Sequence, residues 1–218
     1  ISHKWAQWGL RNLTLSDVQV KIHGNKANIS KIWKTGSGIS VKHEQLVESL
    51  GGKLQISETI TLPKQLDDVA RIGINFEIHG LLNECKYYGV GPHETVPDRA
   101  LGRVGIYKSS VSDLMTDYIK PQENGGRVGV RWFELRDVHG KGLRFETSKP
   151  LMVTISHATS EALADASHNV YVKRSGTTVV TIDAAHRGVG TASCGPDTLD
   201  KYKIKPGLYK FTWSVSVI

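Results

Sequence analysis

Residues 54–62 read LQISETITL, a stretch in which apolar and polar side chains alternate. Alternation with a period of two is typical of a β-strand that has one buried and one solvated face. Residues 69–78, VARIGINFEI, and residues 18–22, VQVKI, show the same period. Further β-rich runs lie at residues 27–34, 39–47, 84–90, 103–107, 128–136, 143–146, 151–156, 169–173, 177–182 and 207–217. The sequence therefore predicts a chain built mostly from strands.

Helical patterns are scarce outside residues 159–167. That stretch, TSEALADAS, has the Ala, Leu and Glu content of a helix and a Thr at its start. Many strands with tight-turn residues between them favour antiparallel sheets packed face to face. A (β/α)₈ barrel is excluded because no helices alternate with the strands, and no fixed repeat indicates a propeller. We expect an all-β fold, a large antiparallel two-sheet sandwich with at most one or two short helices, as a single domain over residues 1–218.

The composition argues against a nucleic-acid-binding protein, a membrane-spanning protein and a disulfide-rich or zinc-binding domain. With 218 residues and 39% hydrophobic residues, the chain can build a real core. The net charge of +7 is spread along the chain, so it does not indicate a nucleic-acid partner. No apolar run approaches the length of a membrane-spanning helix. Cys85 and Cys194 form no CxxC or Cys/His cluster, which fits a reducing, cytoplasmic compartment.

Three irregular stretches interrupt the strands, at residues 87–99, 118–125 and 188–197. Long irregular segments on a β scaffold are where binding residues tend to lie. In the first, His93, Glu94 and Asp98 are of metal-ligand types. The favoured interpretation is a loop in which Glu94 and Asp98 accept hydrogen bonds from backbone amides and from Arg99.

Catalytic patterns are weaker still. Cys194 follows His186 in a glycine-rich loop, but sequence distance cannot establish a nucleophile and its base, and an inert cysteine is favoured. Hydrolysis of a glycoside needs two facing carboxylates. The candidates share no spacing that would place two of them on a common face; they are Glu94, Asp98, Glu123 and Asp197.

Tryptophan offers a platform on which a sugar ring can stack. Five are present: Trp5, Trp8, Trp33, Trp132 and Trp213. The last three lie in strand patterns, where burial in the core is the favoured interpretation.

The loops carry ordered motifs of high specificity. YGVGPHE at residues 88–94 is followed by PDR at 97–99, IYKS at 106–109, YI at 118–119, PQENG at 121–125 and Arg127. GVG at 188–190, SCGP at 193–196, Tyr202 and GLYKF at 207–211 come later in the same order. Together they resemble the C-terminal small-chain domain of family 2 β-galactosidases. The resemblance is strong from about residue 87 onward and weaker before it, where WAQWGL at 5–10 is similar to a segment just inside the start of that domain.

The resemblance implies a β-supersandwich, the last domain of an enzyme that hydrolyses terminal β-D-galactosides such as lactose. In that family a retaining reaction uses two glutamates on a (β/α)₈ domain that this sequence does not contain. We therefore expect no catalytic residue here, and no activity from this segment alone. The expected partners are that catalytic domain, in the same chain or as a large subunit, and the galactoside. No cofactor is expected in this segment, whereas the family's catalytic domain can use Mg²⁺ and a monovalent cation.

The resemblance also assigns site residues. A family loop that brings a tryptophan to the rim of the sugar site corresponds to residues 188–196, with the tryptophan position at Cys194. The expected substrate-proximal residues are Ala192, Ser193, Cys194, Gly195 and Pro196. Cysteine has no aromatic face, so Cys194 cannot offer the surface on which a hexose stacks. The residues expected at an interface or pinning turns are His93, Glu94, Asp98, Arg99, Gln122, Glu123 and Asn124, with a direct sugar contact by His93 or Glu94 as the alternative.

Two function hypotheses follow. The leading one is the non-catalytic C-terminal domain of a β-galactosidase, which packs against the catalytic domain and helps to shape the sugar site. Because Ile1 aligns inside the opening segment of the family domain, we expect the domain to be truncated at its N-terminal end. The alternative is a free-standing carbohydrate-binding β-sandwich module.

Overall fold

A computed structural model describes residues 2–191 and 195–218 of the chain. Strands dominate these residues, with two short α-helices, Ser2–Trp8 (α1) and Ser160–Asp165 (α2). The strands are β1 (Thr14–His23), β2 (Lys26–Lys34), β3 (Ser40–Ser49), β4 (Lys53–Leu62), β5 (Arg71–His79), β6 (Glu84–Gly91), β7 (Arg103–Ser110), β8 (Gly126–Arg136), β9 (Gly142–Ser156), β10 (Thr177–His186) and β11 (Gly207–Val217). Single 3₁₀ turns lie at Leu10–Asn12, Ser112–Leu114, Asn169–Tyr171 and Asp200–Tyr202.

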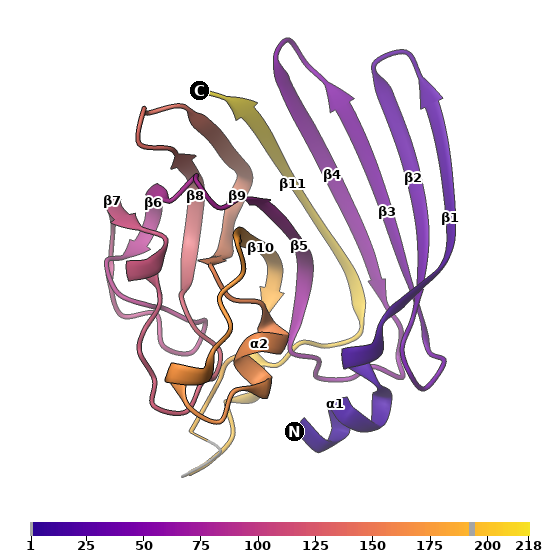
Figure 1. Cartoon of the computed structure of the whole chain (residues 1–218). Helices are drawn as coiled ribbons and strands as arrows, with labels where there is room; N and C mark the ends of the chain where they lie inside the picture. The colour runs from indigo at the N-terminus through magenta and orange to yellow at the C-terminus, as the bar shows by residue number, and fades with distance from the viewer. Residues whose placement is uncertain (1, 192–194) are drawn as a thin grey trace.

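The strand pairs are all antiparallel. Strand β9 belongs to two layers, because its two parts pair with different strands. The order is β1-β2-β3-β4-β11-β9-β8-β6-β7, with β5 and β10 branching from β9. The first part of β9, residues 143–147, pairs with β11, while its last part, residues 152–156, pairs with β10. In Figure 1, β1 to β4 and β11 follow one another across one side of the molecule, with β5 and β10 beside them. The two groups face each other, because Phe76 of β5 stacks on Trp213 of β11 with ring centroids 5.5 Å apart.

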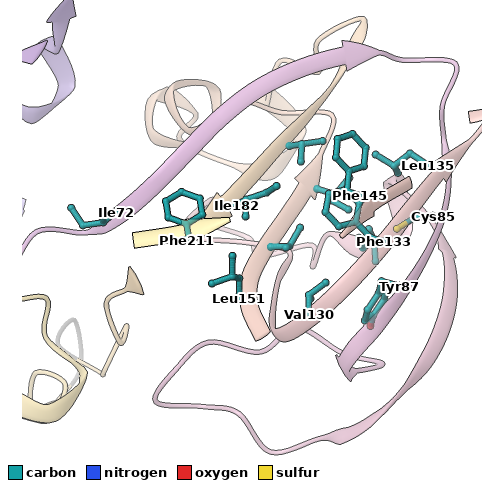
Figure 2. Close-up of a cluster of buried hydrophobic side chains, with 14 of the residues drawn as sticks. Ile72, Cys85, Tyr87, Val130, Phe133, Leu135, Phe145, Leu151, Ile182 and Phe211 are labelled. Atoms are coloured by element: carbon teal, nitrogen blue, oxygen red, sulfur yellow. The ribbon is translucent and has the colours of Figure 1, made fainter. Parts of the chain in front are cut away.

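The core lies where the layers meet. Phe133 of β8 stacks on Phe145 of β9 with a centroid separation of 4.6 Å, and both rings are almost completely buried. Figure 2 shows the two rings beside Leu135, in an apolar cluster that also contains Ile182 and Phe211. Since these side chains come from β8, β9, β10 and β11, the cluster joins strands that are far apart in the sequence.

The predicted fold class is confirmed, and so is the helix within residues 159–167. Thr159 caps α2, with its hydroxyl accepting a hydrogen bond from the amide of Ala162 at 3.1 Å. Such a cap satisfies an amide that the first helical turn leaves unpaired. Within the described ranges, no helix is long and apolar enough to cross a membrane.

Four local predictions were wrong at least in part. Residues 87–91 belong to β6, so the first irregular stretch begins only at Pro92. The predicted strand at residues 169–173 does not form. Asn169–Tyr171 make a 3₁₀ turn, and Val170 and Tyr171 are exposed at the surface. The alternating segment at residues 18–22 is a strand, but all ten positions of β1 are exposed instead of half-buried. Trp33 and Trp132 are half-buried and lie outside the core cluster, whereas Trp213, also half-buried, packs against that cluster.

Candidate functional site

The irregular stretches at residues 92–102, 115–125, 187–191 and 195–206 are connected by carboxylates that each accept several hydrogen bonds. Glu94, 8% exposed, is the first. One of its oxygens accepts from the Arg99 guanidinium at 2.6 Å and from the Tyr118 hydroxyl at 2.7 Å, and the other accepts from the amide of Gly125 at 2.7 Å. Glu94 thus ties the stretch after β6 to the stretch before β8.

Asp98 holds the stretch after β10 in the same way. Its carboxylate accepts from the amides of Val189 at 3.0 Å and Gly190 at 2.7 Å, and from the Thr198 hydroxyl at 2.8 Å. Partial burial raises the pKa of Asp98, but these hydrogen bonds to the charged form outweigh it and leave the pKa below its ordinary value. Asp98 is therefore ionised and holds a segment that follows about ninety residues later in the chain, at Val189 and Gly190. We call this contact the Asp98 clamp.

The glycines of the GVG motif make room for this clamp. A Cβ at Gly188 would lie 2.6 Å from the Asp98 carboxyl carbon and 2.3 Å from the Thr198 hydroxyl oxygen. Gly190 has φ +60°, a left-handed conformation that glycine adopts without steric cost. The motif is thus explained by the close approach of a carboxylate to the backbone.

Arg187 anchors the start of the same segment. Its guanidinium is 4% exposed and donates to both oxygens of Asp68, at 2.7 and 3.0 Å, and to Asp197 at 2.6 Å. Burial lowers the pKa of Arg187, but the hydrogen bonds to Asp68 and Asp197 outweigh it and raise the pKa above its ordinary value. The hydrogen bond from Arg187 in turn lowers the pKa of Asp197. Both ends of residues 187–197 are therefore held by ion pairs.

A second buried ionic cluster lies between β5, β10 and the stretch before β8. Arg71 donates to Glu123 at 2.9 Å and lies 3.2 Å from Asp183, while His186 lies 3.4 Å from Glu123. Burial raises the pKa of Glu123, but His186 and Arg71 outweigh this and lower it. Asp183 is different, because its burial outweighs the attraction of Arg71 and His186 and raises its pKa to about 6. Among the described residues, neither oxygen of Asp183 accepts a well-aligned hydrogen bond, although one lies 3.2 Å from the Arg71 guanidinium.

The raised pKa of Asp183 has a measurable consequence. A carboxyl group whose pKa is higher in the folded than in the unfolded state stabilises the fold at low pH, and this stabilisation is lost as the pH rises through about 6. Asp183→Asn cannot ionise and therefore lacks this pH dependence. We expect the unfolding free energy of the variant, measured relative to the parent, to be about 1–3 kcal/mol higher at pH 7.5 than at pH 4.5. Urea unfolding of both proteins at the two pH values measures the difference. The exposed Asp117→Asn is the matched control, and a difference that does not change with pH for Asp183→Asn would refute the assignment.

The remaining predicted residues lie in different settings. His93 is exposed, and its Nε2 lies 2.6 Å from the carbonyl oxygen of Leu101. Asn124 is buried and exchanges two hydrogen bonds with the backbone of Thr116, at 2.7 and 2.6 Å. Gln122 is exposed. The structure thus brings Glu94 and Arg99 together. His93 and Gln122 belong neither to the ion pairs of Arg187 nor to those of Arg71.

The loop expected to approach substrate is described only in part. Ala192, Ser193 and Cys194 lie outside the described residues. Gly195 and Pro196 are exposed, and each makes one backbone hydrogen bond with Thr191. The carbonyl of Thr191 accepts from the Gly195 amide at 2.6 Å, and its amide donates to the Pro196 carbonyl at 3.2 Å.

The sequence also raised a metal site at Glu94 and Asp98 and a nucleophilic cysteine with His186 as its base. In the structure, these three side chains already have other partners. Both oxygens of Glu94 and both of Asp98 accept hydrogen bonds, and among the described residues no group of three His, Cys, Asp or Glu side chains is placed to hold a metal ion. The side chain of His186, considered as a base for Cys194, is 5% exposed, and its Nδ1 lies 2.7 Å from the carbonyl oxygen of Arg187.

Sequence reasoning missed Arg187, Asp68, Arg71 and Asp183. Asp183 did carry a signal, because a carboxylate in the apolar run TTVVTIDAAH must find a cation or bear a raised pKa when the strand is buried. Asp68 carried none, since its partner is 119 positions away.

Comparison with known proteins adds to this geometry. Residues 2–215 match the family described as "Beta galactosidase small chain". The chain belongs to this family. The β-galactosidase of Arthrobacter sp. (strain B7) is 28% identical over 211 residues, which are 93% of this chain and 21% of that protein. The β-galactosidase of Actinobacillus pleuropneumoniae is 28% identical over 165 residues, 75% of this chain and 16% of that protein.

The matched segments therefore make up only 16% and 21% of the length of these β-galactosidases. Its fold is shared more widely. A GalM/aldose epimerase homologue from C. elegans superimposes with a TM-score of 0.52 at 11% identity, covering 92% of this chain and 68% of that one. This likeness concerns the fold alone.

Proposed function

We propose that this small-chain domain is the C-terminal, non-catalytic part of a glycoside hydrolase family 2 β-galactosidase. It packs against a (β/α)₈ catalytic domain that hydrolyses terminal β-D-galactosides with retention of configuration. The family match over residues 2–215 carries the proposal. The greater length of the related β-galactosidases supports it, because most of each relative lies outside the matched segment.

Within this proposal, the ionic clamps set the position of the loop that borders the sugar site. Asp98 fixes Val189 and Gly190, and Arg187 fixes Asp197, so the residues between them start and end on a rigid frame. Rigid positioning by groups remote from the reacting atoms contributes to catalysis, since a displacement of about 1 Å can reduce the rate on the order of 100-fold. The chain would thus act on the reaction through geometry, with the catalytic glutamates supplied by the partner domain.

The test is turnover of a chromogenic galactoside by the intact enzyme that contains this chain, with Asp98→Ala compared with the parent. We expect kcat/KM to fall about 10- to 100-fold, because the amides of Val189 and Gly190 lose their anchor. The matched control is Asp137→Ala. Asp137 also accepts two backbone amides, from His139 and Lys141, but in the turn between β8 and β9.

The control variant should keep kcat/KM within about twofold of the parent value, given the order-of-magnitude effect expected at Asp98. An unchanged kcat/KM in Asp98→Ala would contradict the role of the clamp. The isolated 218-residue chain provides the baseline and should not turn over the galactoside. Robust turnover by it would overturn the proposed division of labour, and calorimetric binding of lactose by it in the sub-millimolar range would favour a carbohydrate-binding module instead.

A further inference from the structure

Strand β5 lies at the end of its layer. Within residues 2–191 and 195–218, β5 pairs with β10 alone, from Arg71 opposite His186 to His79 opposite Thr177. In an antiparallel ladder the backbone groups of successive residues point alternately to the two sides of the strand. Half of the N–H and C=O groups of β5 therefore point away from β10, along an edge nine residues long.

Along the central residues 72–76, this edge lacks the protections that the other edges have. Charged side chains and bulges commonly prevent strand addition. Strand β1 has a bulge between Leu15 and Asp17 and a charge at Lys21, and β7 carries Arg103 and Lys108. In β5, residues 72–76 carry no charge, and the irregularity in the ladder with β10 lies on the β10 side. The charge of Arg71 is paired with Glu123, and the exposed Glu77, which accepts from a hydroxyl of β10, lies beyond this stretch.

A groove of about 640 Å³ follows this edge. Its wall on the β5 side consists of consecutive residues from Val69 to Phe76, not of every second one. Side chains of one face alternate along a strand, so a wall of consecutive residues means that the groove runs along the edge of β5. The opposite wall is formed by side chains of the other layer, among them Trp33, Val41 and Trp213.

The layer opposite β5 is wider than the layer that covers it. Val20 of β1 is opposite Ile29 of β2, which is opposite Gln45 of β3, a residue of the groove. Directly opposed residues share a face of the sheet. Val18, Val20 and Ile22 thus lie on the inner face, yet they are 47%, 54% and 71% exposed. An apolar strip of this kind on an inner face indicates a surface that is normally covered.

We propose that a further β-strand adds to the edge of β5, fills the groove, and extends the narrower layer over β3 and β2. The occupant is an extended polypeptide with alternating apolar side chains, supplied by the part of the β-galactosidase outside these 218 residues. Its backbone pairs with β5, and its apolar side chains lie against Trp33 and Val41. Only the identity of the donor rests on the proposed function; the strand addition itself rests on the edge and the groove.

The polar groups of the groove favour a polypeptide over a saccharide. Glu58 accepts hydrogen bonds from Gln45 at 2.9 Å and from the Trp213 indole at 3.1 Å, and lies 2.7 Å from Nε2 of His43. The side chain of Lys31 donates to Gln45. Sugar hydroxyls need fixed polar partners, and these groups already satisfy one another. The backbone edge of β5 offers an unpaired row of donors and acceptors, which is the chemistry that an added strand recognises.

Hydrogen exchange tests the proposal. The amides of β5 that point away from β10 should exchange quickly in the 218-residue chain and at least about 100-fold more slowly in the intact enzyme. The β5 amides bonded to β10 should be protected in both samples. The outer edge of β1 is the internal control, because an extension of the opposite layer leaves its amides exchanging quickly in both.

A paired set of variants locates the occupant. Val41→Lys places a charge on the groove wall, and Ser40→Lys places it on the exposed outer face of the same strand. In the intact enzyme, Val41→Lys should reduce the protection of the β5 edge at least about tenfold, whereas Ser40→Lys should leave it unchanged. If Val41→Lys disturbs the whole domain, the amides bonded to β10 will lose protection as well. In that case the proposal is decided by the parent sequence alone, from the exchange of the β5 edge in the 218-residue chain and in the intact enzyme.

Each outcome bears on the proposal. An active intact enzyme in which the β5 edge exchanges as fast as in the isolated chain overturns the inference but leaves the proposed function standing. Protection that appears in the isolated chain as its concentration rises would assign the groove to a second copy and overturn the assigned donor. Protection induced in the isolated chain by galactose or lactose would overturn the strand in favour of a saccharide.

Discussion

Replacing Arg187 by methionine is expected to lower the free energy of unfolding by about 3–5 kcal/mol. Methionine keeps much of the side-chain length but removes every donor. Asp68, which is 5% exposed, then loses both of its bonds from the guanidinium and becomes a buried carboxylate without a counter-charge. Breaking a buried pair costs far more than the pair contributes relative to an apolar replacement, because the remaining charge is not solvated.

Urea denaturation of the parent and variant chains measures this loss. Arg11→Met is the matched control, since Arg11 pairs with Asp165 at 2.8 Å but both side chains are more than 60% exposed. Solvent and salt screen such a surface pair, so we expect no measurable change. The double variant Arg187→Met with Asp68→Asn should recover part of the loss by removing the stranded charge. If Arg187→Met and Arg11→Met have equal effects, the buried ion pair is not what holds residues 187–197.

The single substitution Phe145→Ala is expected to lower the free energy of unfolding by about 3–5 kcal/mol. The ring is 2% exposed, stacks on Phe133, and lies 5.8 Å from the ring of Phe76 and 6.3 Å from that of Trp213. It is therefore shared by β8, β9, β5 and β11. Truncation leaves a cavity at the junction of both layers, where strands anchored on two sides cannot collapse to fill it.

The same denaturation experiment checks this prediction, with Tyr171→Ala as the control. Tyr171 is 65% exposed in a 3₁₀ turn outside the core, so its removal should change the unfolding free energy by less than about 0.5 kcal/mol. A cost of less than about 1 kcal/mol for Phe145→Ala would show that the layers are held together elsewhere, since buried Phe→Ala changes normally cost about 3–5 kcal/mol.

The sequence predicted strands well where a local pattern determines them. Residues 54–62 and 69–78 alternate with period two, and the structure contains β4 and β5 there. The alternation in β1 is just as regular, yet that strand is exposed. Alternation reports which side chains share a face, but whether another layer covers that face depends on distant parts of the polypeptide. The division of β9 between β11 and β10 has the same origin and leaves no local trace.

The site shows the same limit. The residue types and short spacing of Glu94, Asp98 and Arg99 pointed to hydrogen-bonded turns, and Glu94 does accept from Arg99. The partners of Asp98 lie beyond residue 188, and no spacing rule could have named them. The ion pair of Arg187 with Asp68 crosses more than half of the chain. Charged residues could be recognised in the sequence, but which charges meet is decided by the order of the strands.

The position of β11 has a consequence for how the domain forms during synthesis. Residues 207–217 fill the middle of the wide layer, between β4 on one side and β9 on the other. Their ladder partners in β4 are about 150 residues earlier. While a ribosome is still making β10, the border of β4 that β11 occupies in the finished domain has no partner strand. Such non-local pairing slows folding and leaves unpaired borders exposed to other chains. The border of β4 therefore stays open to other chains until β11 has been synthesised.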